Sequence, residues 1–493
     1  MNVISRHCIN PAIQIHQFDE LELKKTHDYQ GFCMLINRWK LLLVDKYDAK
    51  PGQTCLIDFT AIGVFYYAAI FAATELGLIL VVDIPHCYND ADIQSYKVNL
   101  HGKLDFIITH EGKYNPENAW YFEFDCKRNE HLGRNVVFQR ELTDYVPKNA
   151  ELLHTISDMI LCNPKDPVVY ACSSGTTGLP KRLIDSHEKV YLMARRLGKY
   201  LGFESTDKVL HTRNIHHGAS MCYHFLPGFM IGREQFDPGF TFEELNLDCI
   251  AKLVTLIDRY EINQLFLYRP EFLFNYLSTT APVKHKVKVT TLYHITLEVA
   301  RLIKEKNIKF INSPFGDTTI GLGFFIKTVD ANTPLDNYVV GNMGPQLDDN
   351  FFECEVRDLK LYVSCPSIGQ DWKTSNDKFE LINGNFVFEG RADQYRIGDE
   401  WIDFDTMEKE VKRIFKGSAT ASIDFEMQKL YLSVWKENRE AEEEFNQYLR
   451  ETYEAVNVAH VLRNQNVKEF FNGRKIDLSK IRDYCRAELG LSL

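Results

Sequence analysis

Residues 168–183, VVYACSSGTTGLPKRL, carry the densest set of groups in the chain that could bind an anion. A short apolar run, typical of a buried strand, leads into a stretch of hydroxyl residues and glycines that ends at Pro180 and Lys181. Without a Cβ, glycine lets successive backbone N–H groups converge on one anion, and the hydroxyls add donors. The residues expected to bind a phosphate are Ser173, Ser174, Gly175, Thr176, Thr177 and Gly178, with Lys181 beside them.

Two common phosphate-binding motifs do not fit this segment. Pro180 stands where the GxxxxGK[ST] loop requires glycine, and the GxGxxG spacing is absent from the segment. An ordinary surface loop rich in glycine and serine is the alternative interpretation. That alternative leaves the preceding strand, the terminal lysine and the run of hydroxyls unexplained.

The segment resembles the phosphate loop of the adenylate-forming (ANL) superfamily. This group contains acyl- and aryl-CoA synthetases, adenylation domains of peptide synthetases and firefly-type luciferases. Its loop usually reads SGTTGxPKG, and Arg182 replaces the final glycine here. The resemblance implies an enzyme that activates a carboxylic acid with ATP, and further landmarks appear downstream in the family's order.

Phe315, Gly316, Asp317 and Thr318 resemble the family's YGxTE segment, whose aromatic residue packs on adenine and whose threonine contacts the α-phosphate. Thr319 replaces the glutamate that helps to hold magnesium, so the resemblance leaves the metal ligands unknown. Asp317, or a water held by Thr319, could bind the magnesium ion in place of the glutamate. Upstream, residues 293–296, YHIT, replace the family's glycine-rich adenine loop, and these residues reach positive φ only with strain.

Residues 359–393 resemble the end of the large family domain. Asp377 falls where a family aspartate binds the ribose hydroxyls, a role that suits a carboxylate because it accepts two hydrogen bonds. Arg391 matches an arginine that contacts the nucleotide, and Asp393 matches the hinge about which the small domain rotates. A plain turn at Asp377, beside Asn376, is the alternative.

The segment NIHHGAS, residues 214–220, resembles the family's acyl-pocket motif, in which a histidine matching His217 gates the cavity. We expect His216, His217, Gly218 and Ala219 to line the substrate pocket; core or surface histidines are the alternative. Residues 219–222 bring no charge to the pocket, whereas amino-acid-activating relatives place an aspartate there. The resemblance therefore favours an acid without an α-amino group. Arg269 could bind a second anionic group or form a surface salt bridge.

Near the C-terminus, NGRKIDLSKIRDY resembles the family's catalytic-lysine segment and makes Lys475 the candidate catalytic cation, with Thr318 and Lys181 as its partners in the site. A lysine on a rotating domain can approach the α-phosphate as negative charge builds in the transition state. The alternative for a single lysine is a solvated residue at a helix start.

The function implied is ATP-dependent formation of an acyl-adenylate, followed by transfer to coenzyme A, with ATP and Mg²⁺ as cofactors. An amine or a carrier protein remains open as the acceptor. The residues ADQYRIGDEWID, which would form the pantetheine tunnel, are one residue short of the family pattern. Two other classes also stay open: a catalytically impaired nucleotide-binding sensor or scaffold, and an oxygenase of luciferase type.

The amino-acid composition indicates which classes of binding partner to expect. Among 493 residues, 57 Lys and Arg against 68 Asp and Glu give a net charge of −11, which disfavours nucleic acid and anionic membranes as general partners. Twelve cysteines without CxxC spacing, and an N-terminus unlike a signal peptide, predict a cytoplasmic location. We interpret the apolar residues 61–82, interrupted at Glu75 and Gly77, as a buried helix and strand rather than a membrane span.

Alternating apolar runs and helical segments predict an α/β fold in which a large domain, residues 1–390, contains layered and largely parallel sheets. Residues 391–493 are expected to form a small mobile α+β domain that carries the catalytic lysine. Apolar stripes there mark helices near Met407 and Phe445. Residues 284–289, in which Lys284, Lys286 and Lys288 alternate with other residues, are predicted to form an edge strand with one solvated face.

Overall fold

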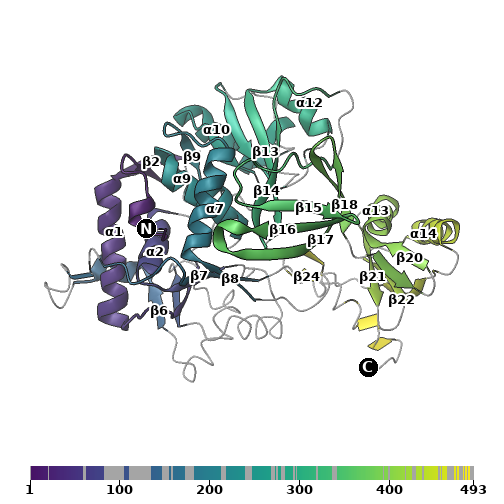
Figure 1. Cartoon of the computed structure of the whole chain (residues 1–493), viewed down its shortest axis with the longest axis horizontal. Coiled ribbons are helices and arrows are strands. Elements are labelled where there is room, and N and C mark those ends of the chain that lie inside the picture. The colour runs from purple at the N-terminus through teal and green to yellow at the C-terminus, as the bar shows by residue number, and fades with distance from the viewer. Residues whose placement is uncertain are drawn as a thin grey trace.

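The computed structural model describes most of the chain, which Figure 1 shows as a large body of sheets and helices with a smaller group of elements at one side. The described residues are 2–19, 21–58, 63–82, 105–109, 135–146, 155–156, 159–172, 182–212, 218–238, 247–267, 273, 276–278, 284–292, 295, 297–317, 320–335, 341–391, 394–397, 400–416, 418–424, 429–435, 438–453, 456, 458–463, 471–472, 475–476, 481, 484–485 and 487–488.

The first sheet has six strands in the order β6-β5-β3-β4-β7-β8 and is parallel except at its β7–β8 edge. Its apolar strands are buried, as is typical of parallel sheets covered on both faces. The strands are β3 (Thr54–Asp58), β4 (Ile79–Val81), β5 (Phe106–Thr109), β6 (Asn135–Phe138), β7 (Pro167–Cys172) and β8 (Arg182–Ser186).

The buried helix and strand predicted within residues 61–82 are present as α2 (Val64–Glu75) and β4, joined at Gly77, whose φ is +69°. Glu75 is fully buried and pairs with Arg6 at 2.5 Å and with Lys40 at 2.9 Å. Burial by itself would raise the pKa of the Glu75 carboxyl, but the hydrogen bonds and charge of Arg6 and the charge of Lys40 lower it. No helix within the described residues is long and apolar enough to cross a membrane.

The second sheet has eight strands in the order β14-β13-β12-β11-β9-β10-β1-β2, of which the six between the two edge strands run parallel. One hydrophobic cluster packs α10 and α12 on one face, and the larger cluster covers the other face with α1, α2, α7 and α9. The strands are β1 (Gln14–Asp19), β2 (Glu22–Asp28), β9 (Lys208–Leu210), β10 (Glu234–Asp237), β11 (Gln264–Phe266), β12 (Val287–Thr290), β13 (Ile308–Asp317) and β14 (Gly321–Val329).

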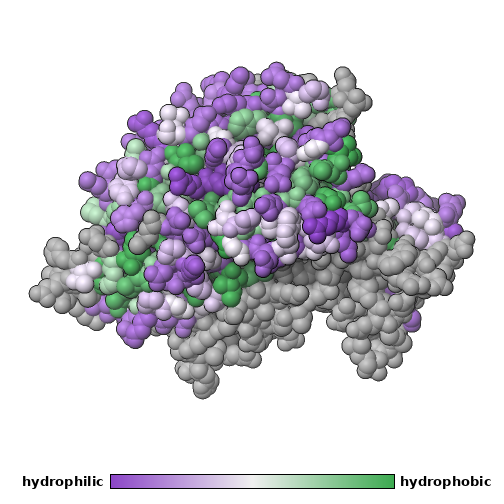
Figure 2. Space-filling view, viewed as in Figure 1, coloured by the Kyte–Doolittle hydropathy of each residue, from purple (hydrophilic) through white to green (hydrophobic). Residues whose placement is uncertain are grey.

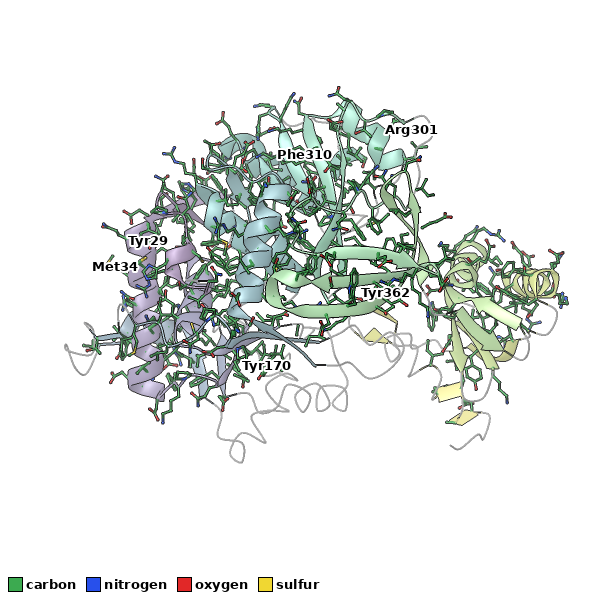
Figure 3. All side chains as sticks on the ribbon, viewed as in Figure 1. Tyr29, Met34, Tyr170, Arg301, Phe310 and Tyr362 are labelled. Carbon is green, nitrogen blue, oxygen red and sulfur yellow. The ribbon has the colours of Figure 1, made fainter. Side chains whose placement is uncertain are left out.

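Side-chain caps start two of the helices of this body, α1 at Asp28 and α7 at Ser186. The Ser186 hydroxyl accepts a hydrogen bond from the N–H of Lys189 at 3.3 Å, which starts α7 directly after β8. Met34 lies on the outer side of α1 and is 64% exposed (Figure 3). The helices are α1 (Tyr29–Leu41), α2, α5 (Gln139–Asp144), α7 (His187–Tyr200), α8 (Gly218–Ser220), α9 (Leu226–Ile231), α10 (Leu247–Tyr260) and α12 (Leu297–Glu305), with short η1 (Arg6–Cys8), η2 (Leu42–Lys46), η4 (Met221–Phe225) and η5 (Pro366–Ile368).

The edge strand predicted for residues 284–289 is wrong. These residues lead into β12, which lies between β11 and β13, and all four of its residues are buried. Lys288 is 2% exposed because its ammonium donates to both carboxylate oxygens of the buried Asp207, at 2.7 and 2.9 Å. Alternation of lysine with valine suggests a solvated face, but a buried carboxylate supplies the pairing that lets the charge enter the interior.

The third sheet is antiparallel and interrupts the α/β alternation expected up to residue 390. Its strands, in the order β15-β16-β17-β18, are joined by turns with positive φ at Asp358, Leu359, Asn383 and Gly384. An Asn-Gly pair is a strong hairpin signal, since both residues tolerate this conformation. The strands are β15 (Glu353–Arg357), β16 (Lys360–Cys365), β17 (Gln370–Ile382) and β18 (Asn385–Arg391).

Most of the remaining elements form the smaller group, whose own hydrophobic cluster of buried residues extends from Ile402 to Val456. The helical stripes predicted from sequence are confirmed: Met407, Val411 and Phe445 are buried in this cluster. The elements are β19 (Gln394–Ile397), β20 (Glu400–Asp403), α13 (Phe404–Phe415), β21 (Ala419–Asp424), β22 (Lys429–Val434), α14 (Arg439–Thr452), β23 (Val458–Arg463), β24 (Phe471–Asn472) and β25 (Lys475–Ile476).

Hydrophilic residues are spread over the face of the molecule that Figure 2 presents, with hydrophobic ones in smaller groups between them. This pattern agrees with an interior filled by the clusters above. The expected α/β fold with a large, parallel-rich sheet and a smaller α+β part is confirmed.

Candidate functional site

Ser375 joins two acidic residues that the sequence analysis placed at the nucleotide. Asp317 is the last residue of β13 in the second sheet, and Asp377 lies within β17 of the third sheet. The buried Ser375 hydroxyl lies 3.2 Å from Oδ2 of Asp317 and 3.1 Å from Oδ2 of Asp377, so its one proton can serve either carboxylate. The Asp377 N–H donates to the Ser375 oxygen at 3.3 Å. The fold thus brings together two carboxylates from different sheets.

Arg391 is placed beside this pair by the register of the third sheet. Asp377 and Arg391 are directly opposite each other on the antiparallel strands β17 and β18. Two residues that sequence analysis assigned to the nucleotide are therefore neighbours across one strand pair. The Arg391 side chain itself lies outside the described side chains.

Phe315 and Gly316 precede Asp317 on β13. The Phe315 ring is half-buried and packs edge-on against Phe379, with 5.1 Å between ring centroids, and parallel to Phe325 at 6.0 Å. Its expected packing on adenine stays a prediction. Glycine is required at position 316 because a Cβ there would lie 2.7 Å from the Cα of Leu322 on the adjacent strand β14.

The expected phosphate loop connects two strands whose ends are fixed. Cys172, the last residue of β7, pairs with Arg182, the first residue of β8, so the two residues that flank the loop are neighbours on antiparallel strands. Arg182 stands where the family loop has glycine, and here it begins a strand. The loop itself lies outside the described residues, including Ser173, Ser174, Gly175, Thr176, Thr177, Gly178 and Lys181.

Lys475 is the first residue of β25, paired in register with Asn472 of β24. The structure describes the backbone of this short hairpin but not the Lys475 side chain. In the view of Figure 1 the β24 label lies below β17, away from the labels of β20–β22. The predicted meeting of Lys475 with Lys181 is therefore not tested.

The expected acyl-pocket motif leads into a buried helical segment. Gly218 begins α8, Ala219 is 3% exposed, and the helix continues through the π-helical turn η4 into α9. The turn carries His224, whose Nε2 lies 2.9 Å from the carbonyl oxygen of Leu210. Burial lowers the pKa of His224 to about 4, so its ring is neutral at pH 7. His216 and His217 lie outside the described residues.

Comparison with known proteins identifies the family. Residues 48–287 match the model of the AMP-binding enzyme family. That span contains the phosphate-loop segment and the helices α8 and α9. Residues 48–287 therefore belong to the AMP-binding enzyme family. Among curated protein sequences, none matches this chain.

Solved structures of adenylate-forming enzymes share its fold over nearly the whole chain. The structure titled for fatty acyl-adenylate ligases from E. coli and L. pneumophila is 14% identical, covers 99% of each chain and has a TM-score of 0.71. O-succinylbenzoate coenzyme A synthetase (MenE) from Bacillus subtilis, in complex with AMP, is 15% identical, covers 96% of each chain and has a TM-score of 0.69. McyG A-PCP, complexed with phenylalanyl-adenylate, is 13% identical, with a TM-score of 0.68 over 97% of this chain and 81% of its own.

Ser375 was not among the residues predicted from the sequence. The signal was available, because residues two apart on a strand share a face, and Ser375 precedes the predicted Asp377 by two. Its contact with Asp317, by contrast, joins different sheets and could not be read from either segment. Of the remaining predicted residues, Thr318 and Asp393 lie outside the described residues.

Proposed function

We propose that this adenylate-forming enzyme joins a carboxylic acid to the α-phosphate of ATP, releases pyrophosphate, and then transfers the acyl group to coenzyme A. The observation that carries the proposal is the pair of carboxylates held by Ser375 at the junction of two sheets. The match of residues 48–287 to the AMP-binding family supports it separately, since that span contains the phosphate-loop segment, whereas the pair lies downstream of it.

In this proposal Asp377 binds the ribose hydroxyls and Asp317 contributes to holding Mg²⁺. A carboxylate accepts hydrogen bonds from two hydroxyls, which suits ribose. Mg²⁺ prefers oxygen ligands and is usually bound through one or two carboxylates together with substrate phosphates. Asp317 offers one such carboxylate, whose Oδ2 lies 3.2 Å from the Ser375 hydroxyl. The bound ion would neutralise charge on the phosphates.

The phosphates themselves are assigned to the loop at residues 173–181, with Lys181 and Thr318 at the α-phosphate. Cys172 and Arg182 support this assignment, because their pairing keeps the two ends of the loop together at the end of the first sheet. Lys475 is proposed to approach the α-phosphate from residues 391–493, acting as a lid that turns at Asp393. A separate hydrophobic cluster in that part supports its treatment as a unit.

The substrate carboxylate is proposed to bind near Ala219 on α8 and to attack the α-phosphate in line, with pyrophosphate leaving on the opposite side. Catalysis then depends on positioning and on neutralising negative charge. Coenzyme A is the proposed acceptor. MenE, which shares this fold, is a coenzyme A synthetase, and this supports coenzyme A rather than an amine or a carrier protein as the acceptor.

The test is exchange of labelled pyrophosphate into ATP, measured across a panel of carboxylic acids without coenzyme A. Exchange that depends on one group of acids establishes adenylation, and a thioester product on addition of coenzyme A establishes the acceptor. If the acyl product forms only when an amine or a carrier protein is added, that molecule and not coenzyme A is the acceptor. Tight ATP binding without exchange for any acid would favour a nucleotide-binding sensor instead.

A further inference from the structure

Within the part of the chain that the structure describes, two buried polar atoms on the helical segment formed by α8 and η4 have no hydrogen-bond partner. They are the hydroxyl oxygen of Ser220 and Nδ1 of His224, in residues that are 3% and 4% exposed. Residues four apart on a helix lie on one face, so the two atoms belong to the same side of this segment. A polar atom buried without a partner is unfavourable, and it is often explained by a ligand or a water that binds there.

The hydrogen-bonding role of His224 is fixed by its other nitrogen. Nε2 lies 2.9 Å from the carbonyl oxygen of Leu210, which can only accept, so Nε2 carries the proton. In the neutral ring Nδ1 is then a hydrogen-bond acceptor. Its missing partner must therefore be a donor. Ser220 can both donate and accept.

His224 lies where an α/β sheet binds its ligands. Leu210 is the last residue of β9, and Phe266 is the last residue of the neighbouring parallel strand β11. The His224 ring stacks on Phe266 with centroids 5.6 Å apart, which places it over the carboxyl ends of both strands. Ligands of open parallel sheets bind beyond these ends. Short π-helical turns such as the one that carries His224 also occur frequently at functional sites.

We propose that the acid activated by this enzyme carries a hydroxyl group, which donates to Nδ1 of His224 and accepts a hydrogen bond from the Ser220 hydroxyl. The inference rests on the proposed function and specifies its substrate class. A protonated amine fits less well, since a buried ammonium requires a carboxylate partner and residues 219–222 bring none. An acid with only hydrocarbon beyond its carboxylate would leave both atoms unpaired.

The decisive measurement is pyrophosphate exchange by the wild-type enzyme with matched acids: benzoate against its three monohydroxy derivatives, and butanoate against 2-, 3- and 4-hydroxybutanoate. We expect kcat/KM for at least one hydroxy acid to exceed that of its parent by about 100-fold or more, because the parent leaves buried groups unpaired. Exchange that is equal within every matched set overturns the hydroxyl assignment and leaves adenylation intact. Exchange with no acid overturns the proposed function as well.

Two variants locate the recognition. His224→Phe keeps a ring on Phe266 but removes the acceptor, and Ser220→Ala removes the hydroxyl; each should reduce the preference for the hydroxy acid at least tenfold, mainly by lowering its own kcat/KM. Ser433→Ala is the control, because Ser433 is also buried without a partner but lies in β22. If the His224 variant does not fold, the Ser220 variant and the wild-type preference still decide. Unchanged preference in folded variants overturns the assignment to these residues.

Discussion

Asp317 and Asp377 are tied to each other through the single hydroxyl of Ser375, although one ends a strand of the mostly parallel second sheet and the other lies within the antiparallel third sheet. The two carboxylates consequently hold a fixed relation only while both sheets stay in place. The affinity for a nucleotide that binds both carboxylates should therefore depend on how the two sheets are held together.

Replacing Ser375 by alanine should weaken ATP binding about 10- to 100-fold, because a hydrogen bond to a charged group contributes about 1.5–3 kcal/mol. Isothermal titration with ATP and Mg²⁺ measures the effect. Ser364→Ala is the matched control: Ser364 is also buried in the third sheet and donates to a carboxylate, that of Glu353, at 3.2 Å. Equal losses of ATP affinity in the two variants would show that Ser375 supports only the sheet.

Replacing Lys475 by alanine should slow single-turnover adenylate formation about 100- to 1,000-fold, since removing one transition-state donor costs about 3–4 kcal/mol. ATP affinity should change little, because this contact strengthens only as charge develops. Rapid-quench measurement with labelled ATP tests both. Lys412→Ala, which removes an exposed lysine of α13, should leave the rate unchanged. A normal rate in the Lys475 variant refutes the assignment.

Replacing Lys288 by methionine should lower the free energy of unfolding by about 3–5 kcal/mol, because it leaves the buried Asp207 carboxylate without its cation. Urea denaturation measures the change. Lys286→Met gives the comparison two residues away: Lys286 is exposed, so its replacement should change stability by less than about 0.5 kcal/mol. Similar values for the two variants would contradict the buried ion pair.

Stability should fall as the pH drops below about 6.5. Burial lowers the pKa of His187 to about 4, of His224 to about 4 and, together with the charge of His224, of His211 to about 3. Between these values and the unfolded pKa near 6.5, the unfolded chain binds more protons, so acid favours unfolding. Each histidine contributes up to about 1.4 kcal/mol per pH unit.

Urea denaturation at half-unit steps from pH 8 to pH 5 should therefore show a plateau above pH 7 and a decline below it. His224→Phe should make the decline less steep, since one of the buried rings that resist protonation in the folded state is gone. A stability profile that is flat down to pH 5 would mean that these histidines take up protons as readily in the folded state as in the unfolded chain.

Much of the fold follows from local sequence. The apolar segment 61–82 had to be a buried helix and strand because Gly77 interrupts it, and the stripes at Met407 and Phe445 repeat with the helical period. The family resemblance of the phosphate-loop segment likewise needs only consecutive residues. Such features depend on neighbours within a few positions, which sequence displays directly.

Tertiary structure alone decided the pairings between distant segments. Lys288 reads as a surface lysine until β12 is placed between two other strands with Asp207 at hand, and nothing near Ser375 in the chain points to Asp317. The partnerless Nδ1 of His224 depends in the same way on where the carbonyl of Leu210 comes to lie. The charge state, burial and hydrogen bonding of a side chain depend on the residues around it. For these residues, the neighbours come from strands that are far apart in the sequence.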